Sequence, residues 1–243
     1  MNAIEIQGLR KCYGSLTAVD DLNLTIGQGE FFALLGVNGA GKTTTIKMLS
    51  CLTLPTAGDA KLLGRSICTE AEQVKRVIAV SPQETAIAPN LSVTENLEFL
   101  AGIHGLSKEA AKARTAVMLE TLGLQPVAKQ RAKTLSGGWQ RRLSIALALV
   151  SQPEILFLDE PTLGLDVLAR RELWRVIEAL KGKVTVILTT HYLEEAEALA
   201  DRIGVMAAGR LKAVGTVAEL LAMTGGKNLE DAFVILAEGG AAQ

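Results

Sequence analysis

Residues 31–43 read FFALLGVNGAGKT, five apolar residues followed by a turn that fits the pattern G-x-x-x-x-G-K-[ST]. The apolar run predicts a strand buried on both faces, and a helical pattern follows to about Leu52. Glycines let backbone N–H groups wrap a phosphate chain without Cβ clashes, and the helix start near Lys42 adds a positive dipole end. The stretch therefore predicts a nucleoside triphosphate site. A chance glycine-rich turn is the alternative, and the strand–loop–helix context counts against it.

Composition limits what else the chain can be. It has 243 residues, a net charge of −1, 49% hydrophobic residues and 21% charged residues. This predicts a large folded core, and the balanced charge predicts no nucleic-acid partner. The longest stretch without Asp, Glu, Lys or Arg is 11 residues, as in Leu143–Pro153, whereas a membrane-spanning helix needs about 20 apolar residues. We therefore expect no span, and the three scattered cysteines suit reduced thiols in the cytoplasm.

Strand-like and helical patterns divide the chain. Ile4–Ile6 and Leu22–Ile26 alternate as antiparallel strands do, and Ile203–Met206 with Leu211–Val214 predict a hairpin. Three further apolar runs predict buried strands that alternate with helices in a parallel α/β sheet: Val77–Val80, Ile155–Leu158 and Val184–Leu188. Residues 92–150 have helical periodicity, with a helix over Ala110–Leu122 that closes at Gly123 and a buried helix over Leu143–Val150.

These patterns predict one domain over residues 1–243. Its α/β core comprises residues 1–84, with an N-terminal antiparallel β subdomain, and residues 151–220. A helical subdomain is inserted at 85–150, and a short C-terminal extension covers 221–243, where we expect the tail from Gly239 to fray.

Two carboxylates follow the apolar run that begins at Ile155. Ligands of open α/β sheets bind at the carboxyl ends of the strands, so Asp159 is placed to hold Mg²⁺ on the β- and γ-phosphates. Strand pleating predicts that Glu160 points the other way, where it is a candidate base for an attacking water. The alternative for Glu160 is an ordinary solvated strand end.

Two further polar residues occupy strand ends. His191 follows the run that begins at Val184, and a neutral imidazole there can bond to the γ-phosphate and the water. Gln83 follows Val77–Val80, where its amide can reach Mg²⁺ or water. Structural roles are the alternatives for both, and His104 has no comparable context.

Residues 135–140, LSGGWQ, predict a second anion site at the start of the buried helix. Ser136 can cap the helix, and Gly137 and Gly138 expose backbone N–H groups. An ordinary helix cap is the alternative. One chain would then have two sites for phosphate but only one loop that binds a triphosphate. A head-to-tail dimer would account for this, because the second site of each chain would cover the γ-phosphate bound by the other.

The chain resembles the ATP-binding subunit of ABC transporters over essentially all of residues 2–236. The matching motifs, in chain order, are Lys42, Gln83, Leu135–Gln140, Asp159-Glu160, Leu163–Asp166 and His191. The resemblance implies a P-loop NTPase with a RecA-like parallel sheet core, and an ATP hydrolase that uses ATP and Mg²⁺. It also implies that the chain pairs with a second copy or a homologous ATPase subunit and drives a separate transmembrane permease. The implied location is cytoplasmic, on the inner face of the cell membrane through that permease.

Residue roles carry over position by position. The resemblance implies that Tyr13 stacks on adenine and that the phosphate cradle is formed by Asn38, Gly39, Ala40, Gly41, Lys42, Thr43 and Thr44. It implies Mg²⁺ ligation by Thr43, Gln83 and Asp159, and contact with the partner's γ-phosphate by Ser136, Gly137 and Gly138. The implied catalytic residues are Glu160 as base, His191 as switch, Gln83 and Lys42, and Asp166 matches a dimer contact.

Some positions depart from the family pattern. Val37, Leu163 and Val167 replace its usual residues, and the last two affect the details of communication across the dimer. Three segments resemble ABC-2-type exporters: Thr189–Glu197, Arg141–Leu143 and Leu229–Phe233. The alternatives are a non-transport ABC ATPase acting in DNA repair, on ribosomes or in iron–sulfur assembly, and a regulatory module without turnover. A GTPase would need an NKxD motif, which the sequence lacks.

Overall fold

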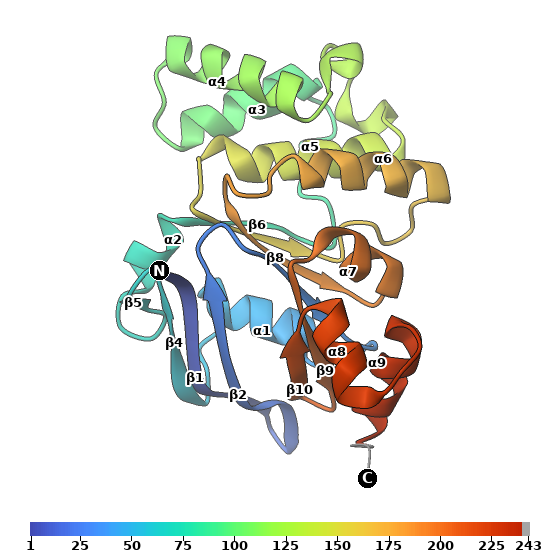
Figure 1. Cartoon of the computed structure of the whole chain (residues 1–243). Helices are drawn as coiled ribbons and strands as arrows, with labels where there is room; N and C mark the ends of the chain where they lie inside the picture. Colours follow the sequence, from blue (N-terminus) through green and yellow to red (C-terminus); the bar gives the residue numbers. More distant parts are fainter. Residues whose placement is uncertain (240–243) are drawn as a thin grey trace.

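Two β-sheets form the framework of the chain, which a computed structural model describes over residues 1–239 (Figure 1). The larger sheet has the order β10-β9-β3-β8-β7-β6, and only β10 runs antiparallel to its neighbour. Its strands are β3 Phe31–Leu35, β6 Ile78–Ser81, β7 Ile155–Asp159, β8 Thr185–Thr190, β9 Arg202–Ala207 and β10 Arg210–Gly215. The predicted α/β class with a parallel core is confirmed.

The smaller sheet is antiparallel and has the order β2-β1-β4-β5. Its strands are β1 Asn2–Tyr13, β2 Leu16–Gly27, β4 Ala57–Leu62 and β5 Arg65–Ser66. The first two are much longer than the predicted strands Ile4–Ile6 and Leu22–Ile26, because β1 pairs with both β2 and β4 and several register shifts interrupt its alternating pattern.

Burial on both faces explains the apolar runs of the central strands. Every residue of β3, β7 and β8 is buried. Phe31 and Leu35 belong to one apolar cluster, and Phe32 and Leu34 belong to the cluster on the opposite face. Burial of one such side chain stabilises the fold by about 1.5–3 kcal/mol.

Helices cover the sheets and form a layer at the top of Figure 1. The helices are α1 Lys42–Leu49, α2 Ala71–Lys75, α3 Val93–Ile103, α4 Lys108–Thr121, α5 Gly137–Val150, α6 Val167–Glu178, α7 Leu193–Leu199, α8 Val217–Thr224 and α9 Leu229–Glu238, with 3₁₀ turns at Gln125–Val127 and Ala132–Thr134. Each residue from Leu143 to Val150 is buried, as predicted. The chain leaves α4 through Gly123 at φ +62°, also as predicted. The division into subdomains stays a prediction.

Element ends differ in places from the sequence pattern. The helix predicted to reach Leu52 ends at Leu49, and Cys51 follows at φ +57°. The predicted hairpin is confirmed as β9 and β10, joined at Ala208 and Gly209, whose positive φ angles match the twist of antiparallel strands. Of the tail expected to fray, residues 240–243 lie outside the described part. Within residues 1–239, no helix combines the length and apolar character that crossing a bilayer requires.

Candidate nucleotide site

The glycine-rich loop connects β3 to α1 and requires glycine at specific positions. Gly41 has φ +103°, and a Cβ there would lie 2.4 Å from the carbonyl oxygen of Ala18. Gly39 has φ +82°, and no atom lies within 4 Å of the place where its Cβ would be. The tip of the β9–β10 hairpin braces the loop, because Gly209 N donates to Ala40 O at 3.1 Å. The loop conformation is therefore set by backbone geometry.

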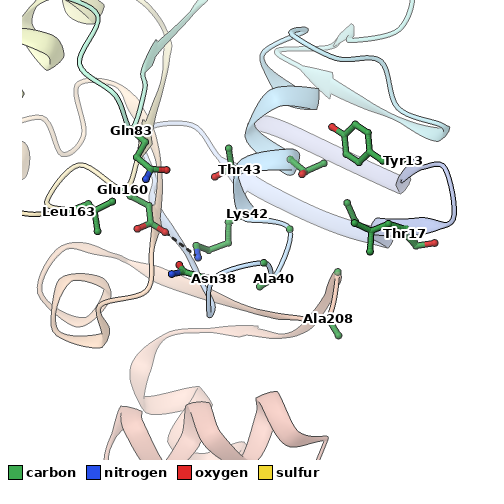
Figure 2. Close-up of a pocket in the computed structure, with 16 residues that line it drawn as sticks. Tyr13, Thr17, Asn38, Ala40, Lys42, Thr43, Gln83, Glu160, Leu163 and Ala208 are labelled. Atoms are coloured by element: carbon green, nitrogen blue, oxygen red, sulfur yellow. Dashed lines mark ion pairs between the residues drawn. The ribbon is translucent and has the colours of Figure 1, made fainter.

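A cavity of about 680 Å³ opens over this loop (Figure 2). That volume is within the range of small-molecule sites. Ten predicted site residues line it: Tyr13, Asn38, Gly39, Ala40, Gly41, Lys42, Thr43, Thr44, Gln83 and Glu160. The strand β2 and the β9–β10 turn supply lining residues that sequence reasoning missed: Leu16, Thr17, Ala18, Ala208 and Gly209. Only tertiary pairing brings these to the site, so no sequence motif marks them.

Lys42 lies at the base of the cavity. Its Nζ donates to Gly36 O at 2.7 Å and to Val37 O at 3.2 Å, and lies 3.3 Å from Glu160 Oε1. Only 4% of Lys42 is exposed. The loop carbonyls thus hold the ammonium at a fixed point beside the backbone N–H groups, an arrangement suited to binding phosphate.

Asp159 ends β7 and faces the first turn of α1. Thr43 Oγ1 donates to Asp159 Oδ1 at 3.2 Å, and Thr189 Oγ1 donates to the same oxygen at 2.5 Å. A carboxylate beside a threonine hydroxyl is a hard-oxygen donor set that fits Mg²⁺, which is typically held by one or two carboxylates together with phosphates and water. Within residues 1–239, no group of three or more His, Cys, Asp and Glu side chains is arranged to hold a metal ion.

Glu160 does not point away from Asp159 as pleating predicted. Its φ is +47°, which ends the extended conformation and returns the side chain to the phosphate loop. Glu160 Oε1 faces the ammonium of Lys42 (Figure 2), and Glu160 Oε2 lies 2.7 Å from Nδ1 of His191 on the other side. The structure thus brings Lys42, Glu160 and His191 together from three separate elements.

The second predicted anion site lies elsewhere on the chain. Ser136 is at the N-cap of α5, but its hydroxyl caps no backbone N–H, so the predicted capping is wrong. Ser92 and Ser107 do cap their helices with their hydroxyls. Ser136 and Gly137 are exposed, and none of Ser136, Gly137 and Gly138 lines the cavity. The donors at the start of α5 are therefore available to a group outside this chain.

Asp166, predicted as a dimer contact, begins α6. Its Oδ1 accepts a hydrogen bond from Ala169 N at 2.9 Å. A carboxylate at this position also favours the positive end of the helix dipole. The structure therefore gives Asp166 a role within its own chain.

Glu195 is a buried carboxyl that sequence reasoning missed. It lies on α7, four residues after His191, and has no exposed surface. Trp174 Nε1 donates to Glu195 Oε1 at 3.2 Å, whereas Oε2 has no hydrogen-bond partner in the described part of the chain. Burial raises the pKa of Glu195, and the neighbouring side chains of Thr190, Thr162 and Trp174, together with the charge of Arg170, only partly offset that effect.

A parallel sheet, a glycine-rich loop closed by lysine and threonine, and a carboxylate at the end of another strand of the same sheet define a phosphate-loop nucleoside triphosphatase. The family model described as ABC transporter matches residues 19–163. The chain belongs to the ABC transporter family.

Two relatives cover nearly the whole chain. The daunorubicin resistance ATP-binding protein DrrA3 of Streptomyces coeruleorubidus is 43% identical over 239 residues, 98% of this chain and 75% of that protein. The linearmycin resistance ATP-binding protein LnrL of Bacillus subtilis (strain 168) is 40% identical over 227 residues, 93% of this chain and 73% of that protein.

Two solved structures share the fold. An ATP-binding subunit of an ABC transporter has a TM-score of 0.84 at 30% identity, covering 96% of this chain and 99% of that one. The ATP-binding cassette MJ0796, in a dimeric post-hydrolysis state with ADP and Pi, has a TM-score of 0.78 at 27% identity, covering 88% and 98%. The chain is an ATP-binding and ATP-hydrolysing subunit of a transporter, and the non-transport alternative does not hold.

Proposed function

We propose that the chain is the motor subunit of an ABC-2-type exporter and works as a head-to-tail dimer. The partner is a second copy of the chain or a homologous ATPase subunit. The supporting observation is the exposed start of α5, where Ser136 and Gly137 present donors that no group within residues 1–239 uses. In a head-to-tail pair, these donors would close the partner's cavity over the γ-phosphate.

The chain's own residues bind the nucleotide in this proposal. Tyr13, which is half exposed at the cavity rim, stacks on the adenine ring. Lys42 and the N–H groups of residues 38–44 bind the phosphates. Thr43, Asp159 and Gln83 hold Mg²⁺, which neutralises charge on the β- and γ-phosphate oxygens when bound.

Glu160 is the proposed catalytic base. It accepts a proton from a water that attacks the γ-phosphorus; the bond to the bridging oxygen breaks, and ADP leaves. An ionised Glu160 can only accept in its 2.7 Å contact with His191, so Nδ1 of the imidazole carries the proton. His191 therefore orients the base, and Lys42 stays beside the transferred phosphoryl group.

The exporter assignment rests on the resistance proteins of Streptomyces and Bacillus, together with the three exporter-like segments of the sequence. A chain of this kind needs a separate transmembrane permease, and that permease would hold it at the cytoplasmic face of the membrane. Copurification of the tagged chain with a multi-span protein from detergent-solubilised membranes would support the permease. Quantitative recovery of the chain without such a protein would count against it.

Light scattering tests the dimer. We expect Glu160→Gln with Mg-ATP to double its mass, because bound ATP is no longer consumed, and EDTA to return it to the monomer mass. Ser136→Arg in the Glu160→Gln background should stay monomeric while still binding ATP, since Ser136 lies outside its own cavity. A dimer that forms equally well with Ser136→Arg would contradict the proposed arrangement.

A further inference from the structure

Arg141 joins α5 to the segment that carries Gln83. It lies about one and a half turns beyond Ser136, and only 6% of it is exposed. Its Nη1 donates to Pro82 O at 2.8 Å, and its Nη2 donates to Gln83 O at 2.7 Å. The planar guanidinium thus grips two consecutive carbonyls, a geometry that the single ammonium of lysine cannot reproduce.

The segment that Arg141 binds, called the Gln83 segment below, makes few other hydrogen bonds. Residues 82–87 lie between β6 and α3, outside regular structure. Within residues 1–239, and apart from strand pairing, the backbone of this segment makes only the two hydrogen bonds with Arg141. Gln83 and Glu84 are exposed, whereas the guanidinium of Arg141 is buried, and a buried donor that loses its acceptor costs about 1–3 kcal/mol. The two bonds therefore tie this backbone to α5.

The two ends of the segment are also attached to helices. Ser81 Oγ lies 3.0 Å from Ser144 Oγ, one turn beyond Arg141 on α5. At the other end, the side chain of Asn96 on α3 bonds to both the N–H and the carbonyl of Ala88. The segment is therefore bonded to α5 at its start and to α3 at its end, while Gln83 faces the nucleotide cavity (Figure 2).

The link keeps its charge at neutral pH. Burial lowers the pKa of Arg141, and the carboxylates of Asp159 and Glu195 partly offset that effect. A guanidinium does not lose its proton in proteins. The two bonds to the Gln83 segment are therefore charge-assisted under all conditions in which the enzyme turns over.

We propose that Arg141 is a positioning residue that makes α5 and the Gln83 segment move as one body. When the donors at the start of α5 engage the nucleotide of a second copy, the movement of α5 is carried through Arg141 to Gln83 in the chain's own cavity. This inference rests on the proposed head-to-tail dimer. Arg141 does not line the cavity and acts through the backbone of Gln83.

Arg114 offers a matched control. Its guanidinium also donates to two consecutive carbonyls, those of Leu149 and Val150, at the opposite end of α5. Arg114→Gln therefore removes the same kind and number of bonds from the same helix. These bonds involve no residue of the Gln83 segment. Melting temperatures of Arg141→Gln and Arg114→Gln measure any general loss of stability.

Steady-state kinetics separate positioning from stability. We expect Arg141→Gln to lower kcat about tenfold or more, with KM for ATP and the affinity for a fluorescent ATP analogue within about twofold of the parent. Arg141→Lys, which keeps the charge but not the fork, should recover part of kcat, and Arg114→Gln should keep nearly all of it. Equal kcat values for Arg141→Gln and Arg114→Gln would overturn the proposal.

Amide hydrogen exchange tests the geometry directly. Among residues 83–88 the hydrogen-bonded amide is that of Ala88, which donates to Asn96 Oδ1 at 2.8 Å. With ATP bound, exchange of the Ala88 amide should be faster in Arg141→Gln than in the parent, and unchanged in Arg114→Gln. Unchanged exchange in Arg141→Gln would overturn the proposed attachment.

A double-mutant cycle with Ser136→Ala tests the transmission. If the start of α5 acts through Arg141, the double variant should have about the kcat of the slower single variant. Fold losses that multiply would show two independent effects and overturn the proposal. If Ser136→Ala alone changes neither kcat nor the dimer, the proposed dimer site fails. If Ser136→Ala lowers kcat but Arg141→Gln does not, only the Arg141 link fails.

Discussion

The carboxylate of Glu160 lies 3.3 Å from the ammonium of Lys42, and both side chains are almost fully buried. The other oxygen of the same carboxylate contacts His191 at 2.7 Å. A buried charge that loses its partner is costly, so each member of this group constrains the others. The residue proposed to act on water and the residue proposed to bind phosphate are therefore placed by one set of contacts.

Replacement of Glu160 by glutamine removes the proposed base with little change in shape. We expect Glu160→Gln to lower ATP turnover by at least about a hundredfold while ATP binding is retained. Glu154→Gln is the control, because Glu154 is an exposed carboxylate just before the other end of β7. Phosphate release assays measure both variants. Turnover in Glu160→Gln near that of Glu154→Gln would exclude the assigned base.

Lys42→Ala removes the buried ammonium and leaves Glu160 without its cationic partner. Hydrogen bonds to charged groups contribute about 1.5–3 kcal/mol, so the affinity for ATP should fall by roughly tenfold to a hundredfold. Lys47→Ala removes an exposed lysine from the same helix and should leave the affinity unchanged. Titration with a fluorescent ATP analogue gives both values. Equal affinities would contradict the proposed role of Lys42.

Removal of Mg²⁺ by EDTA should stop turnover, and added Mg²⁺ should restore it. Asp159→Asn weakens the proposed metal site, so the Mg²⁺ concentration at half-maximal turnover should rise about tenfold or more. Asp231→Asn, a change in the first turn of α9 and outside the nucleotide cavity, is the control. A Mg²⁺ dependence that is the same in Asp159→Asn and the parent would rule out ligation by Asp159.

The buried carboxyl of Glu195 predicts a pH-dependent stability. Burial raises its pKa above the usual value of 4.5, so at pH values above 4.5 the folded chain holds this proton more tightly than the unfolded chain does. The contribution of Glu195 to the free energy of unfolding therefore falls as pH rises between those two pKa values. Glu195→Gln keeps a neutral side chain at all pH values, so its stability relative to the parent should increase from pH 5 to pH 8. Urea unfolding measures the difference, and a difference that is constant with pH would contradict the assignment.

The central strands could be predicted because their environment is simple. Both faces of β3, β7 and β8 are buried, so each strand is a continuous apolar run, and the phosphate loop has few alternative conformations. Polar residues at the carboxyl ends of these strands identified Asp159 and His191 for the same reason.

Features that depend on backbone geometry or tertiary pairing could not be predicted. Alternation along a strand placed Glu160 on the wrong side, because one residue at positive φ reverses the direction of its side chain. Ser136 has the residue type of a helix cap without making the bond. Arginine and glutamate usually lie at the protein surface, and only the fold shows that Arg141 and Glu195 are buried.

If each active site is built from two chains, as proposed, ATP turnover must depend on protein concentration. If the start of α5 in one copy completes the cavity of the other, turnover per chain should fall toward zero on dilution. At low protein concentration, the total rate should become proportional to the square of that concentration. Turnover per chain that stays constant from nanomolar to micromolar protein, with no dimer present by light scattering, would show that a single chain forms a complete active site.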